Sequence, residues 1–186
     1  IISVFTPISV IFGAVFFNRM METSGAMNTL RSWLGNISEN PVAQLMIIGW
    51  AFAFMLEGAS GFGTPVAIAA PILVGIGFKP MQVVMLALVM NSVPVSFGAV
   101  GTPTWYGFKT LLDSGTIGGE DVSSIGKYSA LIHFVAAFVI PILALRFIVS
   151  WKEIKQNILF ILLSVLSCTV PYLLIAQFNY EFPSLV

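Results

Sequence analysis

The feature of this sequence that most constrains its fold is the length of its apolar stretches without charge. Residues 80–108 contain no Asp, Glu, Lys or Arg, and neither do residues 1–18 or 156–180. Only 9% of the 186 residues are charged, whereas a soluble domain carries about 25%. Since lipid offers no water to backbone groups, we expect an all-α integral membrane protein, folded as a multi-span helical bundle.

The charge balance and the cysteine count exclude several functions. Eight Lys and Arg residues balance eight Asp and Glu residues, so no basic field exists to bind nucleic acid. The one cysteine, Cys168, cannot form an internal disulfide or a four-cysteine metal site. The sequence also lacks a nucleophile elbow, a dinucleotide-binding fingerprint and a histidine metal motif. We therefore predict that the chain is not an enzyme and has no cofactor or metal site.

Charged residues divide the chain into membrane segments and polar connections. We predict single transmembrane helices over 1–18, 128–148 and 157–178, because each has about the 20 residues that a crossing needs. The segment 19–40 is predicted to be a connector and 113–127 a loop, since both are polar.

Two further apolar segments are interrupted by glycine and proline. Segment 41–78 contains GASGFGTP at 58–65, and segment 80–112 contains SFGAVGTP at 96–103. Both residue types break helices, and both interruptions end in Gly-Thr-Pro. We predict a re-entrant hairpin over 41–78, with its tip at 58–64, followed by a broken transmembrane helix over 80–112. Paired interruptions of this kind indicate a transporter binding site.

The distribution of positive charge favours the hairpin. If 41–78 returns to the side from which it started, six of the eight basic residues share one side, namely Arg19, Arg31, Lys79, Arg146, Lys152 and Lys155. If it crosses once, the split is even. The positive-inside rule then puts 19–40 in the cytoplasm and 113–127 outside. Two short full crossings give the same count, so that alternative stays open.

Residues at the two interruptions could bind a small anion. Thr64-Pro65 and Thr102-Pro103 are typical of helix starts, which direct N–H groups and a positive dipole end toward a carboxylate. Packing between helices is the alternative explanation for such small residues. We predict substrate contacts from glycine backbones, hydroxyls and one amide: Ser60, Gly61, Gly63, Thr64, Asn91, Ser92, Ser96, Gly98, Gly101 and Thr102.

Glu57 is the only acidic residue inside an apolar run. Low dielectric and the negative end of the preceding helix both disfavour its charged form, so the carboxyl is a natural proton carrier. A hydrogen-bonded acid that caps the turn is the alternative. His133 could also relay a proton, although a lone histidine near the start of a span more commonly packs.

Residues 55–68 (MLEGASGFGTPVAI) resemble the signature stretch of the L-lactate permease family. The resemblance continues through GIGFKP at 75–80 and NSVPVSFGAVGTP at 91–103. It implies a proton-coupled symporter of L-lactate, and in some members glycolate, in the bacterial cytoplasmic membrane. The wider superfamily of ion transporters pairs re-entrant hairpins with broken helices in inverted repeats.

Members of this family are much longer than this chain. We therefore expect a fragment with about one repeat, which contacts membrane lipid and the remaining half of the same polypeptide. Two other functions stay open. A sodium-coupled carboxylate transporter could hold Na⁺ between unwound carbonyls and Glu57. A membrane-embedded enzyme or assembly subunit could use Glu57 as an acid, and we favour this less.

Overall fold

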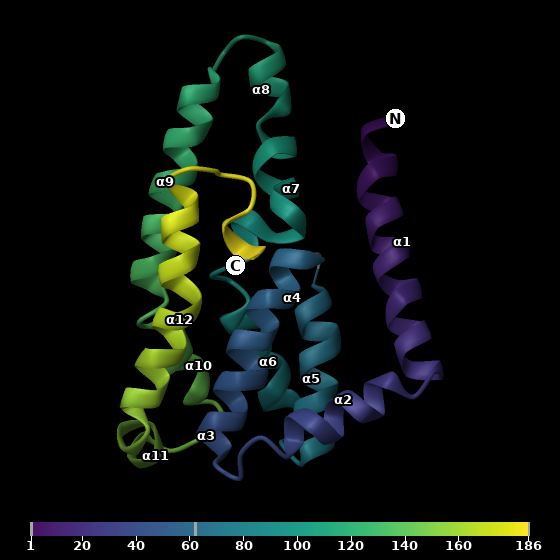
Figure 1. Cartoon of the computed structure of the whole chain (residues 1–186), viewed down its shortest axis with the longest axis vertical. Coiled ribbons are helices and arrows are strands. Elements are labelled where there is room, and N and C mark those ends of the chain that lie inside the picture. The colour runs from purple at the N-terminus through teal and green to yellow at the C-terminus, as the bar shows by residue number, and fades with distance from the viewer. Residues whose placement is uncertain (1, 62, 186) are drawn as a thin grey trace.

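The computed structural model describes residues 2–61 and 63–185, and these form helices joined by turns, with no strand among them. Phe62, in the predicted hairpin tip, lies outside the described residues. Figure 1 shows most helices gathered in one elongated bundle, with α1 standing to one side. The all-α fold class predicted from the sequence is confirmed.

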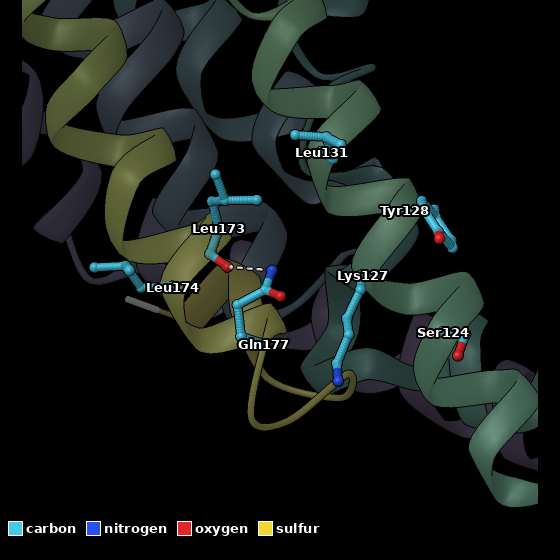
Figure 2. A pocket seen from close by; sticks show the side chains of 7 residues that line it. All are labelled: Ser124, Lys127, Tyr128, Leu131, Leu173, Leu174 and Gln177. Carbon is cyan, nitrogen blue, oxygen red and sulfur yellow. Dashed lines mark hydrogen bonds between the residues drawn. The ribbon is translucent and has the colours of Figure 1, made fainter.

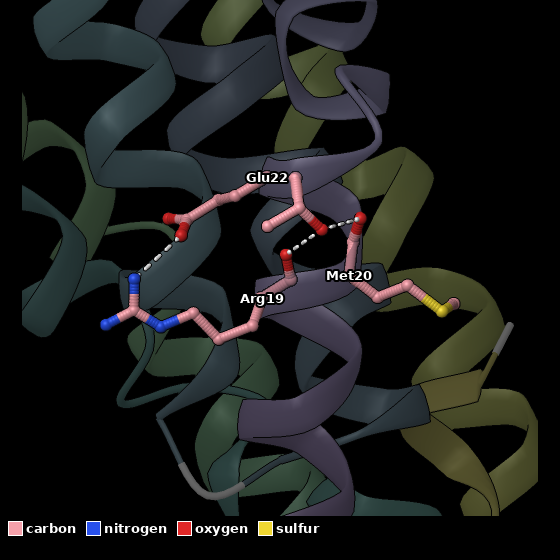
Figure 3. A network of polar contacts seen from close by, with 4 residues as sticks. Arg19, Met20 and Glu22 are labelled. Carbon is pink, nitrogen blue, oxygen red and sulfur yellow. Dashed lines mark hydrogen bonds and ion pairs between the residues drawn. The ribbon is translucent and has the colours of Figure 1, made fainter.

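Helix α1 (Ile2–Thr23) forms an arm beside this bundle, and α2 (Ala26–Gly35) joins it to the bundle, where Met27 and Leu34 of α2 are buried. Helix α1 continues past the end of the predicted span, and the Arg19 guanidinium pairs with the Glu22 carboxylate at 3.2 Å in its last turns (Figure 3). The Thr23 hydroxyl then donates to the Arg19 carbonyl. An exposed ion pair contributes at most about 1 kcal/mol, so packing against the bundle or lipid must stabilise this arm.

The first interrupted segment folds as a helical hairpin. Its first arm runs without a break through α3 (Pro41–Gln44), the π-helix η1 (Leu45–Phe52) and α4 (Ala53–Ala59). The Asn40 side chain caps this arm by accepting hydrogen bonds from the first turn. The second arm, α5 (Thr64–Ile76), packs back against the first. Figure 1 shows both ends of the hairpin low in the bundle and its turn part-way up; the position of that turn within a membrane stays a prediction.

The second interrupted segment bends and continues instead of reversing. It consists of α6 (Pro80–Met90), the 3₁₀ turn η2 (Val95–Phe97), α7 (Gly98–Gly107) and α8 (Lys109–Asp113). The helices before and after the interruption meet at 66°. Figure 1 shows α7 and α8 rising above the hairpin turn.

The remaining chain forms a second pair of long helices that lie side by side (Figure 1). Helix α9 descends along the bundle, two short helices turn at its base, α12 ascends, and η3 folds back toward the hairpin turn. Their bounds are α9 (Gly119–Ala136), α10 (Ile140–Leu145), α11 (Trp151–Gln156), α12 (Ile158–Ala176) and η3 (Pro183–Leu185).

The predicted polar connections are more helical than their composition indicates. The connector 19–40 contains α2, and α9 begins at Gly119, inside the predicted loop over 113–127. The Asp121 carboxylate accepts a hydrogen bond from the Gly118 amide at 2.7 Å. An acidic residue in the first turn also interacts favourably with the helix dipole, so these polar residues start a helix.

The predicted single helix over 128–148 is divided between α9 and α10. Pro141 lies in the first turn of α10, and a proline cannot donate the hydrogen bond that would continue α9. Among the described residues, two helices are long and apolar enough to cross a membrane, Pro41–Ala59 and Ile158–Ala176. The bent helix from α6 to α8 becomes a third if it crosses as one span.

An aromatic cluster holds the two interrupted segments against α12. The fully buried Tyr172 ring contacts Phe54 edge-on at 5.6 Å and Phe97 at 5.4 Å between centroids. Beside it, the Trp50 indole N–H donates to the Ser164 carbonyl at 3.2 Å. Tyr172 therefore joins the hairpin, the second interruption and α12 at one point.

Candidate functional site

The two interruptions lie in direct contact with each other. A side-chain carbon on Gly61 would lie 2.7 Å from the Ala99 amide nitrogen, and one on Gly98 would collide with the Glu57 carboxyl oxygen Oε1. Only glycine at 61 and 98 permits this approach. Segments almost 40 residues apart in the sequence thus meet at the hairpin turn, and the binding site predicted there stays a prediction.

The two Gly-Thr-Pro motifs also share a backbone conformation. Gly63 and Gly101 are both left-handed, with φ of 79° and 73°. The predicted hydroxyl caps are wrong, however. Gly63 caps α5 and Thr64 is its first helical residue, while the Thr102 hydroxyl donates to the Ala99 carbonyl at 2.5 Å. In both motifs the left-handed glycine, and not the threonine side chain, sets the direction of the following helix.

The second interruption contains strained residues. Ala99 and Val100 adopt positive φ, 48° and 56°, immediately before Gly101. Left-handed conformations of such residues cost about 1–3 kcal/mol each and persist only where surrounding contacts impose them. Residues with this strain cluster at ligand sites and switch regions.

Glu57 is buried at the contact between the interruptions, with 2% of its surface exposed. The Asn91 side chain, which follows α6, interacts with its carboxyl group. Even so, Oε2 of Glu57 and Oδ1 of Asn91 are buried and have no hydrogen-bond partner among the described residues. Buried acceptor oxygens without a donor are costly, and a proton or small cation bound at Glu57 would reduce that cost.

The predicted hydroxyl contacts are only partly brought together. The Ser60 hydroxyl donates to the Leu56 carbonyl at 2.8 Å, and the exposed Ser92 hydroxyl donates to the Val89 carbonyl at 2.7 Å. Each hydroxyl therefore donates to a backbone carbonyl of the helix that precedes it. The Ser96 hydroxyl instead lies 3.5 Å from Nε2 of His133 on α9.

The end of the chain closes one side of the site, which the sequence did not predict. A side chain on Gly58 would collide with the Ser184 carbonyl, and one on Gly101 with the Glu181 carbonyl. The buried Ser184 hydroxyl donates to the Pro94 carbonyl at 3.0 Å. Residues 181–184 thus fill the space between α4 and α7. Their only sequence signal is a proline-containing turn after a long span.

His133 joins the second interruption to α12. Its Nδ1 lies 2.7 Å from the Tyr172 hydroxyl, and its Nε2 lies 3.5 Å from the Ser96 hydroxyl. Above Ser96, a cavity of about 180 Å³ opens between α7 and α9. Its lining is Ser96, Phe97, Pro103, Thr104, Phe108, Ile125 and Ser129. Ser96 is a predicted site residue and His133 a predicted second proton carrier, whereas the sequence pattern did not indicate Thr104, Ser129 or Tyr172.

A larger groove of about 460 Å³ lies between α9 and α12 (Figure 2). Its polar groups are exposed or already paired: the Lys127 side chain faces outward, and the Gln177 amide donates to the Leu173 carbonyl at 3.2 Å. Buried polar groups that would orient a small solute are absent from its described lining, so we assign the site to the two interruptions. The groove is lined by Ser124, Lys127, Tyr128, Leu131, Leu173, Leu174 and Gln177.

The sequence was compared with known families and proteins. The L-lactate permease family matches residues 1–186, which is the whole chain. The chain belongs to the L-lactate permease family. The resemblance carried by the two glycine motifs is confirmed, and those motifs lie in contact in the folded chain.

Several curated relatives carry permease names. A Haemophilus influenzae protein provisionally named as an L-lactate permease is 67% identical over the whole chain, which covers 34% of that protein. The Escherichia coli glycolate permease GlcA is 35% identical over 80% of this chain and 25% of its own length. The L-lactate permease of Halalkalibacterium halodurans is 38% identical over 91% of the chain and 32% of its own length.

The chain therefore spans about a third of the length of these relatives. Their names are those of membrane transport proteins and not of enzymes, in agreement with the prediction from sequence. The search of solved structures found no match for this chain.

Proposed function

We propose that the full-length protein containing this chain carries L-lactate, or a related small 2-hydroxy monocarboxylate such as glycolate, across the bacterial cytoplasmic membrane by proton symport. The observation that carries this proposal is Glu57, a buried carboxyl with an unpaired oxygen at the contact of two broken helices. Lactate and glycolate are named because relatives are called L-lactate and glycolate permeases.

The anion would meet the start of α5. This helix has 13 residues and begins after the left-handed Gly63, where an added side-chain carbon would meet nothing within 4 Å. The helix start presents the positive end of its dipole, which favours an anion. Its Thr64 amide already donates to the Gly61 carbonyl and Pro65 has no N–H, so the dipole and the open space at Gly63 are what favour a carboxylate here.

The proton would bind between Glu57 and Asn91. A hydrogen on Oε2 of Glu57 can donate to Oδ1 of Asn91, which gives both unpaired oxygens a partner. Since Glu57 is buried and Oδ1 of Asn91 is too, we expect release of this proton to require a movement of the interruptions. Binding of the lactate anion nearby favours the protonated acid, and by linkage the proton strengthens lactate binding by the same factor.

Sodium coupling is the second candidate, and the same oxygens favour it. Glu57 and Asn91 offer a carboxylate and an amide oxygen without partners, which are the ligand types that a hard cation prefers. A membrane enzyme or assembly subunit that uses Glu57 as an acid is disfavoured by the permease names of the relatives.

Uptake by the full-length protein in vesicles tests these alternatives. We expect inward accumulation of labelled L-lactate when a proton gradient is imposed without sodium, and none when a sodium gradient is imposed at equal pH. Accumulation driven by sodium alone would establish the second candidate. Failure of both gradients to drive uptake by correctly inserted protein would refute the transport proposal.

A further inference from the structure

The hydrogen bonds around His133 have a direction that the burial of Tyr172 fixes. Tyr172 has no exposed surface, and its hydroxyl has one hydrogen-bond partner among the described residues, Nδ1 of His133 at 2.7 Å. A buried hydroxyl whose hydrogen has no acceptor is costly. The Tyr172 hydroxyl must therefore donate to Nδ1.

This direction determines the histidine tautomer. If Nδ1 accepts, the neutral ring carries its hydrogen on Nε2. Nε2 lies 3.5 Å from the Ser96 hydroxyl oxygen, so it can donate to that oxygen. The Ser96 hydrogen is then free to point away from His133, toward the cavity that Ser96 lines. With this arrangement, the Ser96 hydroxyl accepts from His133 and can donate its own hydrogen into the cavity.

A second donor faces the same cavity. The Ser129 hydroxyl lines it from α9 and makes no hydrogen bond with any described residue, although serines in helices commonly bond the carbonyl four residues earlier. The Thr104 hydroxyl, by contrast, is occupied, because it donates to the Ser96 carbonyl at 3.0 Å. The lining of the cavity also includes the apolar side chains of Phe97, Phe108 and Ile125.

The size and chemistry of this cavity fit a small organic anion. Its volume of about 180 Å³ equals roughly six water molecules at about 30 Å³ each. This is enough for a three-carbon acid. Two hydroxyl donors match a carboxylate, and the apolar walls match a short alkyl group.

We propose that the cavity between α7 and α9 binds a small monocarboxylate, whose carboxylate accepts hydrogen bonds from Ser96 and Ser129. His133 and Tyr172 are positioning residues, because they act through the Ser96 hydroxyl and do not touch the anion. This inference rests on the proposed transport of L-lactate and adds a second location on its path, separate from the start of α5.

The first test measures uptake kinetics of the full-length protein. Ser96→Ala and Ser129→Ala should each raise the KM for L-lactate about tenfold, because each removes a hydrogen bond to a charged group. Tyr172→Phe should raise KM in the native background and have no further effect in Ser96→Ala, since it acts through that hydroxyl. Thr169→Val is the control: it removes another α12 hydroxyl, which bonds only the Val165 carbonyl.

A labelling test does not depend on transport. Ser129→Cys, in a background without other cysteines, should react with a small maleimide and be protected by millimolar L-lactate. Unchanged KM in both serine variants, or labelling that lactate does not slow, would overturn the cavity proposal while native uptake leaves the transport proposal standing. Additive effects of Tyr172→Phe and Ser96→Ala would overturn the positioning role. Absence of uptake by the native protein would instead refute the proposed function.

Discussion

The two interruptions of this chain share a motif but differ in what they do to the backbone. At the hairpin turn, the left-handed residues among those the structure describes are Gly61 and Gly63, and the chain reverses. At the second interruption, Ala99 and Val100 join Gly101 in left-handed conformations, and the chain bends by 66° and continues. Gly-Thr-Pro therefore sets how a helix starts, but not whether the chain has turned back before it.

The difference extends to packing. Around Gly63 there is open space, whereas Gly101 lies against the backbone of Glu181. The first interruption also supplies the buried acid, Glu57, and the second supplies Gly98, which lies against it. Of the two left-handed glycines that precede Thr-Pro, Gly63 is therefore the open position and Gly101 the packed one.

The largest expected effect concerns chain reversal. If the first interruption reverses the chain and the second does not, single cysteines at Lys79 and Lys152 will react with an impermeant maleimide only from the cytoplasm, and one at Glu120 only from outside. The measurement is labelling of intact cells and of inverted vesicles that contain the full-length protein. Labelling of Lys79 and Lys152 from opposite sides would show that residues 41–78 cross once. The first interruption would then not reverse the chain.

Next in size is the loss of coupling on substitution of Glu57. Glu57→Gln keeps the shape of the protonated acid and its donor to Asn91, so lactate exchange should continue while accumulation driven by a pH gradient is abolished. Counterflow and gradient-driven uptake in the same proteoliposomes measure the two activities. Accumulation by the variant would show that another residue carries the proton, and His133 is the next candidate. Loss of exchange as well would make Glu57 a structural or substrate-binding residue.

A smaller effect is expected where the two interruptions touch. Gly98 has φ −63° and ψ 168°, a conformation open to alanine, so Gly98→Ala adds only a methyl group against the Glu57 carboxyl. We expect uptake to fall about tenfold or more, since overpacking costs about 1–3 kcal/mol. Gly107→Ala, in the same helix with no atom near its side-chain position, is the matched control. Equal uptake by the two variants would show that this contact is unimportant.

The smallest effect separates the two left-handed glycines. Gly63→Ala and Gly101→Ala carry the same conformational cost of about 1–2 kcal/mol, but only the alanine at 101 collides with the Glu181 carbonyl. Gly101→Ala should therefore lower the Tm of the purified protein more than Gly63→Ala does. Scanning fluorimetry in detergent measures both. Equal Tm values would mean that residues 181–184 do not pack on the second interruption in the whole protein.

Much of the fold and part of the site follow from local sequence. Helices are interrupted where glycine and proline cluster, because each such residue destabilises a helix and several together outweigh its propagation. Single prolines are tolerated, since Pro71 and Pro171 lie within α5 and α12. Local patterns were less informative at polar positions that are compatible with more than one role in the backbone structure. Thr64 looks like a cap but follows the left-handed Gly63, and the polar residues near Asp121 start a helix instead of forming a loop.

The sequence by itself determined that this chain is a helical membrane segment with two matched interruptions and one acid beside the first. It did so because charge depletion, glycine and proline act through the solvent and the local backbone. Only the tertiary structure decided that Gly98 lies against Glu57, that His133 lies between Tyr172 and Ser96, and that residues 181–184 pack on the two interruptions. These contacts join positions far apart in the chain, and packing of whole helices decides which of them meet.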